Sequence, residues 1–204
     1  GGNVSLYNDT KLSNNNVIPI HPTPVIGMVG LIEDINKICK KSWVSTSDQI
    51  WMIGLPLETN ESLDNRISLA ASSFLEYIHG LKTGRPPEID LHLEKQVQLF
   101  LRNIIKKGIV NSAHDLGDGG LAVAISECCI SSGYGANIFL PPSQARLDRL
   151  LFAEGGSRVL VSCSSVQSLE LKKYYKKIFS KESNGFSISN LGIVNDQKKL
   201  LIYQ

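Results

Sequence analysis

The chain lacks a strong excess of charge of either sign, and it lacks long apolar runs. Its 21 basic and 19 acidic residues leave a formal charge of +2 among 204 residues. This balance does not indicate a basic surface for nucleic acid or for membrane headgroups. A membrane-spanning helix needs roughly 18 consecutive apolar residues, and the sequence has no such run. We therefore expect neither nucleic acid nor a membrane as a partner, and we interpret the lysines between Lys172 and Lys181 as a solvated helix face.

The sequence also lacks motifs that would indicate a metal site or a particular reaction. The four cysteines form no Cys-x-x-Cys pair and the four histidines are scattered, which excludes a zinc motif and gives no disulfide framework. Reduced, buried thiols are the default, so we expect a cytoplasmic protein. The sequence has no Walker loop, no Ser/His/Asp order and no close pair of carboxylates. The residues alone therefore do not identify a reaction.

The opening "GGNVSLYND" has no preceding methionine or signal segment. It resembles a loop that feeds a strand, and we expect the chain to be a piece of a larger protein. Residues 3–7 alternate like a short strand, and residues 23–32, "TPVIGMVGLI", are typical of a buried strand. We expect residues 1–40 to lack a core of their own and residues 41–204 to form the main domain.

From Trp43 onward, strand and helix patterns alternate. Strands are expected at 47–56, 110–116, 136–140 and 157–163, helices at 61–80, 91–108, 121–133, 141–156 and 164–183, and a hairpin at 185–203 around Asn195-Asp196. The clearest helix follows Asp90, which can cap its start, and carries an apolar stripe of Leu93, Val97, Phe100 and Ile104. The predicted fold class is α/β (α+β), a mixed sheet sandwiched by helices.

The first candidate site is "GGNVS". Gly2 has no Cβ, so its backbone can approach a nucleotide phosphate. The Asn3 side-chain oxygen is a hard ligand suited to Mg²⁺, and the Ser5 hydroxyl can donate to a phosphate or carbonyl. On spacing alone, a glycine turn that enters an edge strand explains the same residues, and this simpler interpretation is favoured.

The second candidate is "SAHDLGDGGLAVA", a strand that enters a glycine turn and then a helix. Free N–H groups at the helix start can bind an anion. His114 and Asp115 lie at the strand end and Asp118 in the turn, and Asp115 or Asp118 could hold a metal that bridges phosphates. The alternative is structural: Asp118 caps the helix, Gly119 and Gly120 allow close packing, and His114 is a hydrogen-bonded core residue. The sequence leaves both open.

The third candidate is "LFAEGGSR". Glu154 and Arg158 could face a ligand, but a helix C-cap at Glu154 followed by two glycines is the simpler and favoured interpretation.

Together, "GNVSLYN", "PTPVIGMVGLIED", "SAHDLGDGGLAVAISE" and "LFAEGGSRVLVS", in this order, resemble the C-terminal part of the large subunit of the phosphoribosylformylglycinamidine synthase family. The resemblance covers essentially the whole chain. It implies an ATP-dependent ligase of purine biosynthesis that converts formylglycinamide ribonucleotide to the amidine with ammonia from glutamine. It also implies the tail of an N-terminal-type lobe through Lys40, then a complete C-terminal domain like that of aminoimidazole ribonucleotide (AIR) synthetase-related proteins.

By this resemblance, Gly2 contacts ATP, Asn3 binds Mg²⁺ and Ser5 contacts the ribonucleotide. Gly1 stands where the family usually has serine. The implied partners are the upstream part of the subunit, a glutaminase subunit and a small bridging subunit. A set of further residues resembles ligand-binding positions of the first half of the subunit: His114, Asp115, Asp118, Gly119, Gly120 and Glu154. In this half they line a cleft that is expected to be non-catalytic, with an auxiliary nucleotide or empty, and "EGGSR" departs from the Glu-Ser-Gln pattern of the active half.

Two alternatives remain. One is another ATP-dependent enzyme of the same superfamily, such as AIR synthetase, selenophosphate synthetase or thiamine-phosphate kinase, which are not known to carry "GNVSLYN". The other is a non-catalytic interaction domain, in which the strand expected within residues 25–32 mediates assembly. The general-base histidine of the family lies upstream of this chain, so we expect no turnover from the chain alone.

Overall fold

The computed structural model describes residues 9–19, 26–57, 65–143, 145–179 and 185–204. The chain divides into two compact units, Gly1–Ile35 and Asn36–Gln204. The division lies a few residues before the boundary expected at residue 40. Lys40 pairs with Ser112 in the second unit, which ties the segment just before the expected boundary to the main sheet.

In the first unit, β1 (Asp9–Lys11) pairs antiparallel with β2 (Val17–Pro19). The strand expected at residues 3–7 lies outside the described residues. The prediction of a buried strand within residues 23–32 is wrong for residues 26–32, which form no strand and are exposed, with Met28 at 93% and Leu31 at 98%. A strand needs partners for its backbone N–H and C=O groups, and no described strand pairs with this segment.

The second unit, the sheet unit, is built on one six-stranded sheet in the order β4-β6-β3-β7-β5-β8. These strands are β3 (Gln49–Gly54), β4 (Ser112–Asp115), β5 (Gly135–Phe139), β6 (Arg158–Cys163), β7 (Ser187–Asn195) and β8 (Leu200–Tyr203). Every pairing is antiparallel except that of β5 with β8. The prediction of a mixed sheet is therefore confirmed.

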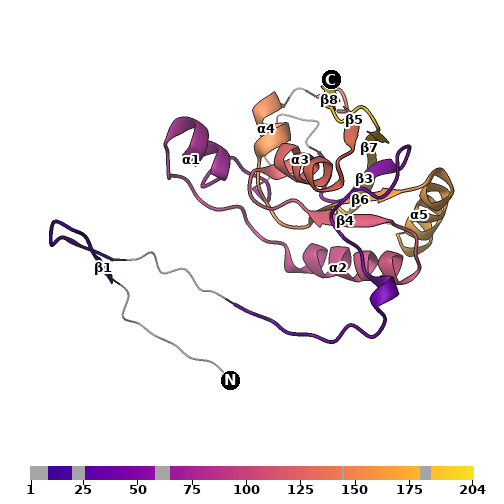
Figure 1. The fold of residues 1–204 in the computed structure, drawn as a ribbon, viewed down its shortest axis with the longest axis horizontal. Coiled ribbons are helices and arrows are strands. Elements are labelled where there is room, and N and C mark those ends of the chain that lie inside the picture. Colours follow the sequence, from indigo (N-terminus) through magenta and orange to yellow (C-terminus); the bar gives the residue numbers. More distant parts are fainter. Residues whose placement is uncertain (1–8, 20–25, 58–64, 144, 180–184) are drawn as a thin grey trace. The chain divides into compact units, whose positions relative to one another are not determined.

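Helices cover both faces of this sheet (Figure 1). One face packs against α2 (Leu91–Lys106) and α5 (Ser165–Ile178), and the other against α3 (Gly120–Ser132) and α4 (Leu147–Phe152). The central strand β3 serves both layers because side chains alternate across a strand. Ile50 and Met52 enter the core beneath α3, and Trp51 and Ile53 enter the core beneath α2.

The predicted terminal hairpin is wrong. β7 and β8 do not pair with each other, because β5 lies between them, antiparallel to β7 and parallel to β8. The Asn195 amide donates to Asn137 Oδ1 and to the Lys199 carbonyl oxygen. The chain between β7 and β8 thus crosses the end of β5 instead of closing a two-residue turn.

The helices predicted from local signals agree only in part with the structure. The start of α2 is confirmed: the Asp90 carboxylate accepts from the backbone N–H groups of His92 and Leu93, and the four predicted stripe residues are buried. The helix expected at 61–80 is shorter and appears as α1 (Ser73–His79), capped by Ser72. Ala71, at φ +55°, interrupts the helical path before it.

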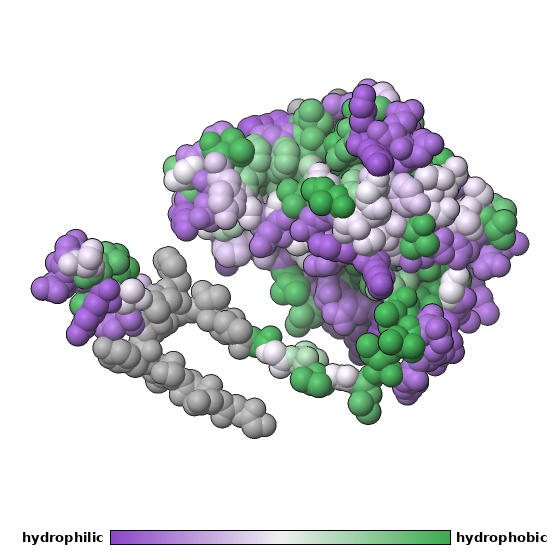
Figure 2. Space-filling model, in the orientation of Figure 1, coloured by the Kyte–Doolittle hydropathy of each residue, from purple (hydrophilic) through white to green (hydrophobic). Residues whose placement is uncertain are grey.

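Figure 2 shows hydrophilic and hydrophobic residues intermixed on the face of the sheet unit in view. Among the described residues, no helix combines the length and apolar character that crossing a membrane requires.

Candidate functional site

The glycine turn after β4 joins the sheet to α3. Gly119 and Gly120 both have left-handed backbone conformations, with φ +79° and +66°. A Cβ on Gly120 would lie 2.7 Å from the Ala153 carbonyl oxygen, so the start of α3 packs directly against the backbone at the end of α4. The interpretation that these glycines allow close packing is supported, with α4 as the neighbour.

Two structural interpretations from the sequence are wrong. Asp118 does not cap α3, whose N-cap is Gly119 without a side-chain hydrogen bond. Glu154 is not the C-cap of α4, a position held by Ala153. Instead, Glu154 Oε1 accepts from the backbone N–H groups of Gly119 and Ser73, each at 2.8 Å. One carboxylate therefore satisfies free donors at the starts of α3 and α1, where negative charge is favoured.

The backbone of Glu154 is also fixed. Its N–H and C=O exchange hydrogen bonds with Ser68, both at 2.9 Å. Arg158 is buried and its guanidinium donates to the Ala153 carbonyl oxygen at 2.8 Å. Both residues therefore have structural partners within the sheet unit.

His114 on β4 faces α3. Its Nε2 lies 2.6 Å from Glu127 Oε2, and its Nδ1 lies 3.3 Å from Asp115 Oδ1. Lys41 lies 3.5 Å from the same Glu127 oxygen. The hydrogen bond from His114, with help from the positive charge of Lys41, lowers the pKa of Glu127 against the opposing effect of desolvation.

A cavity of about 230 Å³ lies beside this cluster. It is lined by His114, Asp115, Gly117, Asp118, Ala124 and Glu127. The structure thus brings together three of the predicted auxiliary residues, while Glu154 does not line this cavity. In the described part of the chain, no group of three His, Cys, Asp or Glu side chains is arranged to hold a metal ion.

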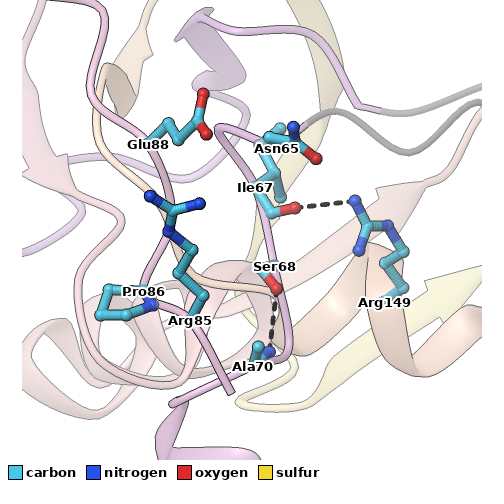
Figure 3. A pocket seen from close by; sticks show the side chains of 8 residues that line it. All are labelled: Asn65, Ile67, Ser68, Ala70, Arg85, Pro86, Glu88 and Arg149. Carbon is cyan, nitrogen blue, oxygen red and sulfur yellow. Dashed lines mark hydrogen bonds between the residues drawn. The ribbon is translucent and has the colours of Figure 1, made fainter.

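A second cavity, of about 320 Å³, is lined in part by Ser68, the backbone partner of Glu154. Figure 3 shows its lining residues: Asn65, Ile67, Ser68, Ala70, Arg85, Pro86, Glu88 and Arg149. We call it the Arg85–Arg149 pocket. Sequence reasoning missed it because its residues come from three separate segments and carry no local motif.

The three residues of the opening motif, Gly2, Asn3 and Ser5, lie outside the described residues. Their roles therefore remain predictions from the sequence.

A mixed sheet between two helical layers, with a strand, glycine turn and helix at its edge, defines a class of α/β domain. Within this class, the family model for AIR synthase related protein, C-terminal domain, matches residues 52–199. The chain belongs to this family. The match spans most of the sheet unit and includes the glycine turn and Glu154.

Similar whole proteins come from Prochlorococcus marinus. The phosphoribosylformylglycinamidine synthase subunit PurL of strain NATL1A is 82% identical over 204 residues, all of this chain and 25% of that protein. The PurL of strain MIT 9303 is 55% identical over 204 residues, all of this chain and 26% of that protein. The chain thus spans about a quarter of the length of these curated relatives.

Solved structures share the fold at low sequence identity. T. maritima PurL complexed with FGAR has a TM-score of 0.64 at 19% identity, over 83% of this chain and 28% of that one. The hydrogenase maturation protein HypE of E. coli has a TM-score of 0.53 at 18% identity, over 80% of this chain and 48% of that one. These likenesses support the fold and carry no residue roles.

Proposed function

We propose that this chain is the C-terminal part of a phosphoribosylformylglycinamidine synthase large subunit. The observation that carries the proposal is the 82% identity to a PurL subunit across all 204 residues. The matched region covers the whole chain, so it includes both the sheet unit and residues 1–35. The proposal is also favoured over other superfamily members by "GNVSLYN", the motif that distinguished the resemblance at the outset.

In the proposed reaction, ATP, ammonia and formylglycinamide ribonucleotide give the amidine, ADP and phosphate. The glycinamide carbonyl oxygen is activated by phosphoryl transfer, ammonia attacks that carbonyl carbon, and phosphate leaves with the former amide oxygen. Mg²⁺ supplies charge neutralisation at the phosphates when it is bound. The backbone of Gly2 would approach the nucleotide, the Asn3 amide oxygen would hold the cation and the Ser5 hydroxyl would position the ribonucleotide.

The proposed partners supply what this chain lacks. The upstream part of the subunit provides the general base and most phosphate-binding groups. A glutaminase subunit delivers ammonia, and a small bridging subunit completes the assembly. We place this complex in the cytoplasm, with an auxiliary-site role proposed for the cavity beside His114, Asp115 and Asp118. Glu154, Gly119 and Gly120 would support that site by holding the start of α3 in place.

The proposal is tested in the full-length subunit that carries this sequence. Ammonia-dependent formation of the amidine is measured for Ser5→Ala and Asn3→Ala, with Ser13→Ala, on an exposed position after β1, as the matched control. We expect both opening-motif variants to lose about 100-fold or more in rate, because each removes a contact to a reacting or charged group. Equal activity of all three variants would remove Asn3 and Ser5 from the site.

The isolated 204-residue chain should show no ammonia-dependent ATP hydrolysis in the presence of formylglycinamide ribonucleotide. Measurable turnover would contradict the proposal that the chain contributes only one wall of the active site.

A further inference from the structure

The Arg85–Arg149 pocket places two guanidinium groups around one short segment. Arg149 projects from α4 and donates through Nη2 to the Ile67 carbonyl oxygen at 2.7 Å. Arg85 comes from the loop between α1 and α2, and in Figure 3 it lies on the other side of the segment from Asn65 to Ala70. Within the described part of the chain, Arg85 forms no ion pair.

Backbone hydrogen bonds hold the walls of this pocket in place. The loop that carries Arg85 is joined to the opposite wall at both ends, by Ala71 N–H to the Thr83 carbonyl at 2.8 Å and Glu88 N–H to the Asn65 carbonyl at 2.9 Å. Gly84 packs so closely that a Cβ there would lie 2.5 Å from Ala70 Cβ. The wall from Asn65 to Ala70 is itself fixed by the exchange of backbone hydrogen bonds between Ser68 and Glu154, so the charged side chains project from a preformed frame.

The chemistry of the lining selects a ligand class. Two arginines favour a phosphate monoester, because a planar guanidinium can give paired, charge-assisted hydrogen bonds to phosphate oxygens. The Glu88 carboxylate can only accept hydrogen bonds, and the Asn65 amide can both donate and accept, which suits hydroxyl groups. The volume of about 320 Å³ lies at the small end of ligand pockets.

We propose that the Arg85–Arg149 pocket binds a phosphorylated sugar, with the phosphate at Arg85, Arg149 adding positive charge to the same pocket, and sugar hydroxyls at Glu88 and Asn65. The inference stands on the pocket alone and does not require the proposed function. It adds a small-molecule site whose residues are separate from the opening motif and from the His114 cavity.

The test uses the full-length protein that carries this sequence and ribose 5-phosphate as the probe. Isothermal titration calorimetry measures the binding. We expect saturable binding that Arg85→Gln weakens about tenfold or more, since a charge-assisted paired contact is lost. Arg102→Gln, an exposed arginine of α2 outside the pocket, is the matched control and should change affinity less than about twofold. The titration is repeated in Ser5→Ala protein, because binding that survives this change but not Arg85→Gln belongs to the pocket.

Glu88→Gln separates the two halves of the proposed ligand. Removing this negative charge should tighten the binding of inorganic phosphate, because its repulsion of the anion is lost. The ratio of the affinity for ribose 5-phosphate to the affinity for phosphate should therefore fall. No saturable binding of ribose 5-phosphate at millimolar concentration, or equal losses in Arg85→Gln and Arg102→Gln, would overturn the site. Equal affinity of the unmodified protein for phosphate and ribose 5-phosphate would overturn the assignment of the sugar.

Discussion

At the scale of single residues, Glu154 shows how one carboxylate can hold the starts of two helices in place. It accepts from the first N–H of α1 and from the N-cap of α3, two helices far apart in sequence. The first turn of α3 contains no acidic residue, and that of α1 contains only Glu76. The same residue links the glycine turn to the frame of the Arg85–Arg149 pocket through Ser68.

Removing this carboxylate should destabilise the sheet unit. We expect Glu154→Ala to lower the free energy of unfolding by about 2 kcal/mol, because two partly buried N–H groups lose their acceptor. Glu154→Gln should cost less, since one amide oxygen can still accept. Urea unfolding measures both, with Glu170→Ala on the exposed face of α5 as control. Equal stability of Glu154→Ala and Glu170→Ala would contradict the role given to Glu154.

The hydrogen bond between His114 and Glu127 predicts an acid-sensitive contribution to stability. The His114 hydrogen bond lowers the pKa of Glu127 below its usual 4.5. A carboxyl with a lowered folded pKa stabilises the protein above the unfolded pKa and loses that contribution as pH falls through the folded pKa. Glu127→Gln should therefore flatten the loss of urea stability below about pH 4.5. Curves from pH 6 to 3 that run parallel to those of the unmodified protein would rule this out.

The cysteines provide a separate prediction. Burial raises the pKa of both Cys128 and Cys163 to about 12. Because the thiolate is the reactive form, both should resist alkylation by iodoacetamide at pH 7.5 until the protein unfolds. Mass spectrometry after brief labelling should find modification first at the half-buried Cys39 and Cys129. Labelling of Cys128 or Cys163 at the same rate in the folded protein would disprove their burial.

At the scale of elements, α3 depends on its first residue. Gly120→Ala would place a side chain at φ +66° and against the Ala153 carbonyl, so we expect a loss of about 3 kcal/mol or more. Gly133 ends the same helix at φ +74° with open space around it, so Gly133→Ala should cost only about 1 kcal/mol. The two urea midpoints provide the comparison. Similar losses would mean that backbone conformation, and not the approach to α4, explains Gly120.

The elements that sequence predicted well are those whose signals are local. The α2 helix carries its cap at Asp90 and its apolar stripe within its own residues, so its start and buried face could both be predicted. The prediction of a hairpin at 185–203 was wrong because both of its strands pair with β5, which lies some 50 residues earlier along the chain. The prediction that Asp118 caps α3 was wrong for a similar reason. The acceptor at the start of α3 is Glu154, which is distant in sequence, and no local pattern indicates it.

In the candidate site, too, the residues that belong to a local pattern could be predicted, and those brought together by the fold could not. The glycine turn with His114 and Asp115 was visible as a strand, turn and helix pattern, and the structure places these residues together at one cavity. The partnership of His114 with Glu127 joins β4 to α3 and could have been suspected only from their adjacency along the chain. Arg85 and Arg149 line one pocket together with a segment of irregular backbone, and irregular segments have no periodicity to interpret.

At the scale of the whole molecule, the sheet unit should be an independent folding unit. Lys40 hydrogen-bonds to Ala113 and Lys41 pairs with Glu127, so residues after Ile35 belong to it. We expect a protein beginning at residue 36 to keep the hydrogen-exchange protection of β3, β6 and β7 found in the 204-residue chain. Loss of protection in these three central strands would show that Gly1–Ile35 contributes to folding.

The strand order has a consequence for how the protein is made. No two neighbouring strands of the six-stranded sheet are consecutive in the chain, and the central β3 pairs with β6 and β7. A ribosome adding 5–20 residues per second would release β3 roughly 100 residues, and several seconds, before its first partner. During that interval the nascent chain exposes "QIWMIG" without a ladder. The order of the sheet therefore makes this segment a target for chaperones until synthesis has passed β6 and β7.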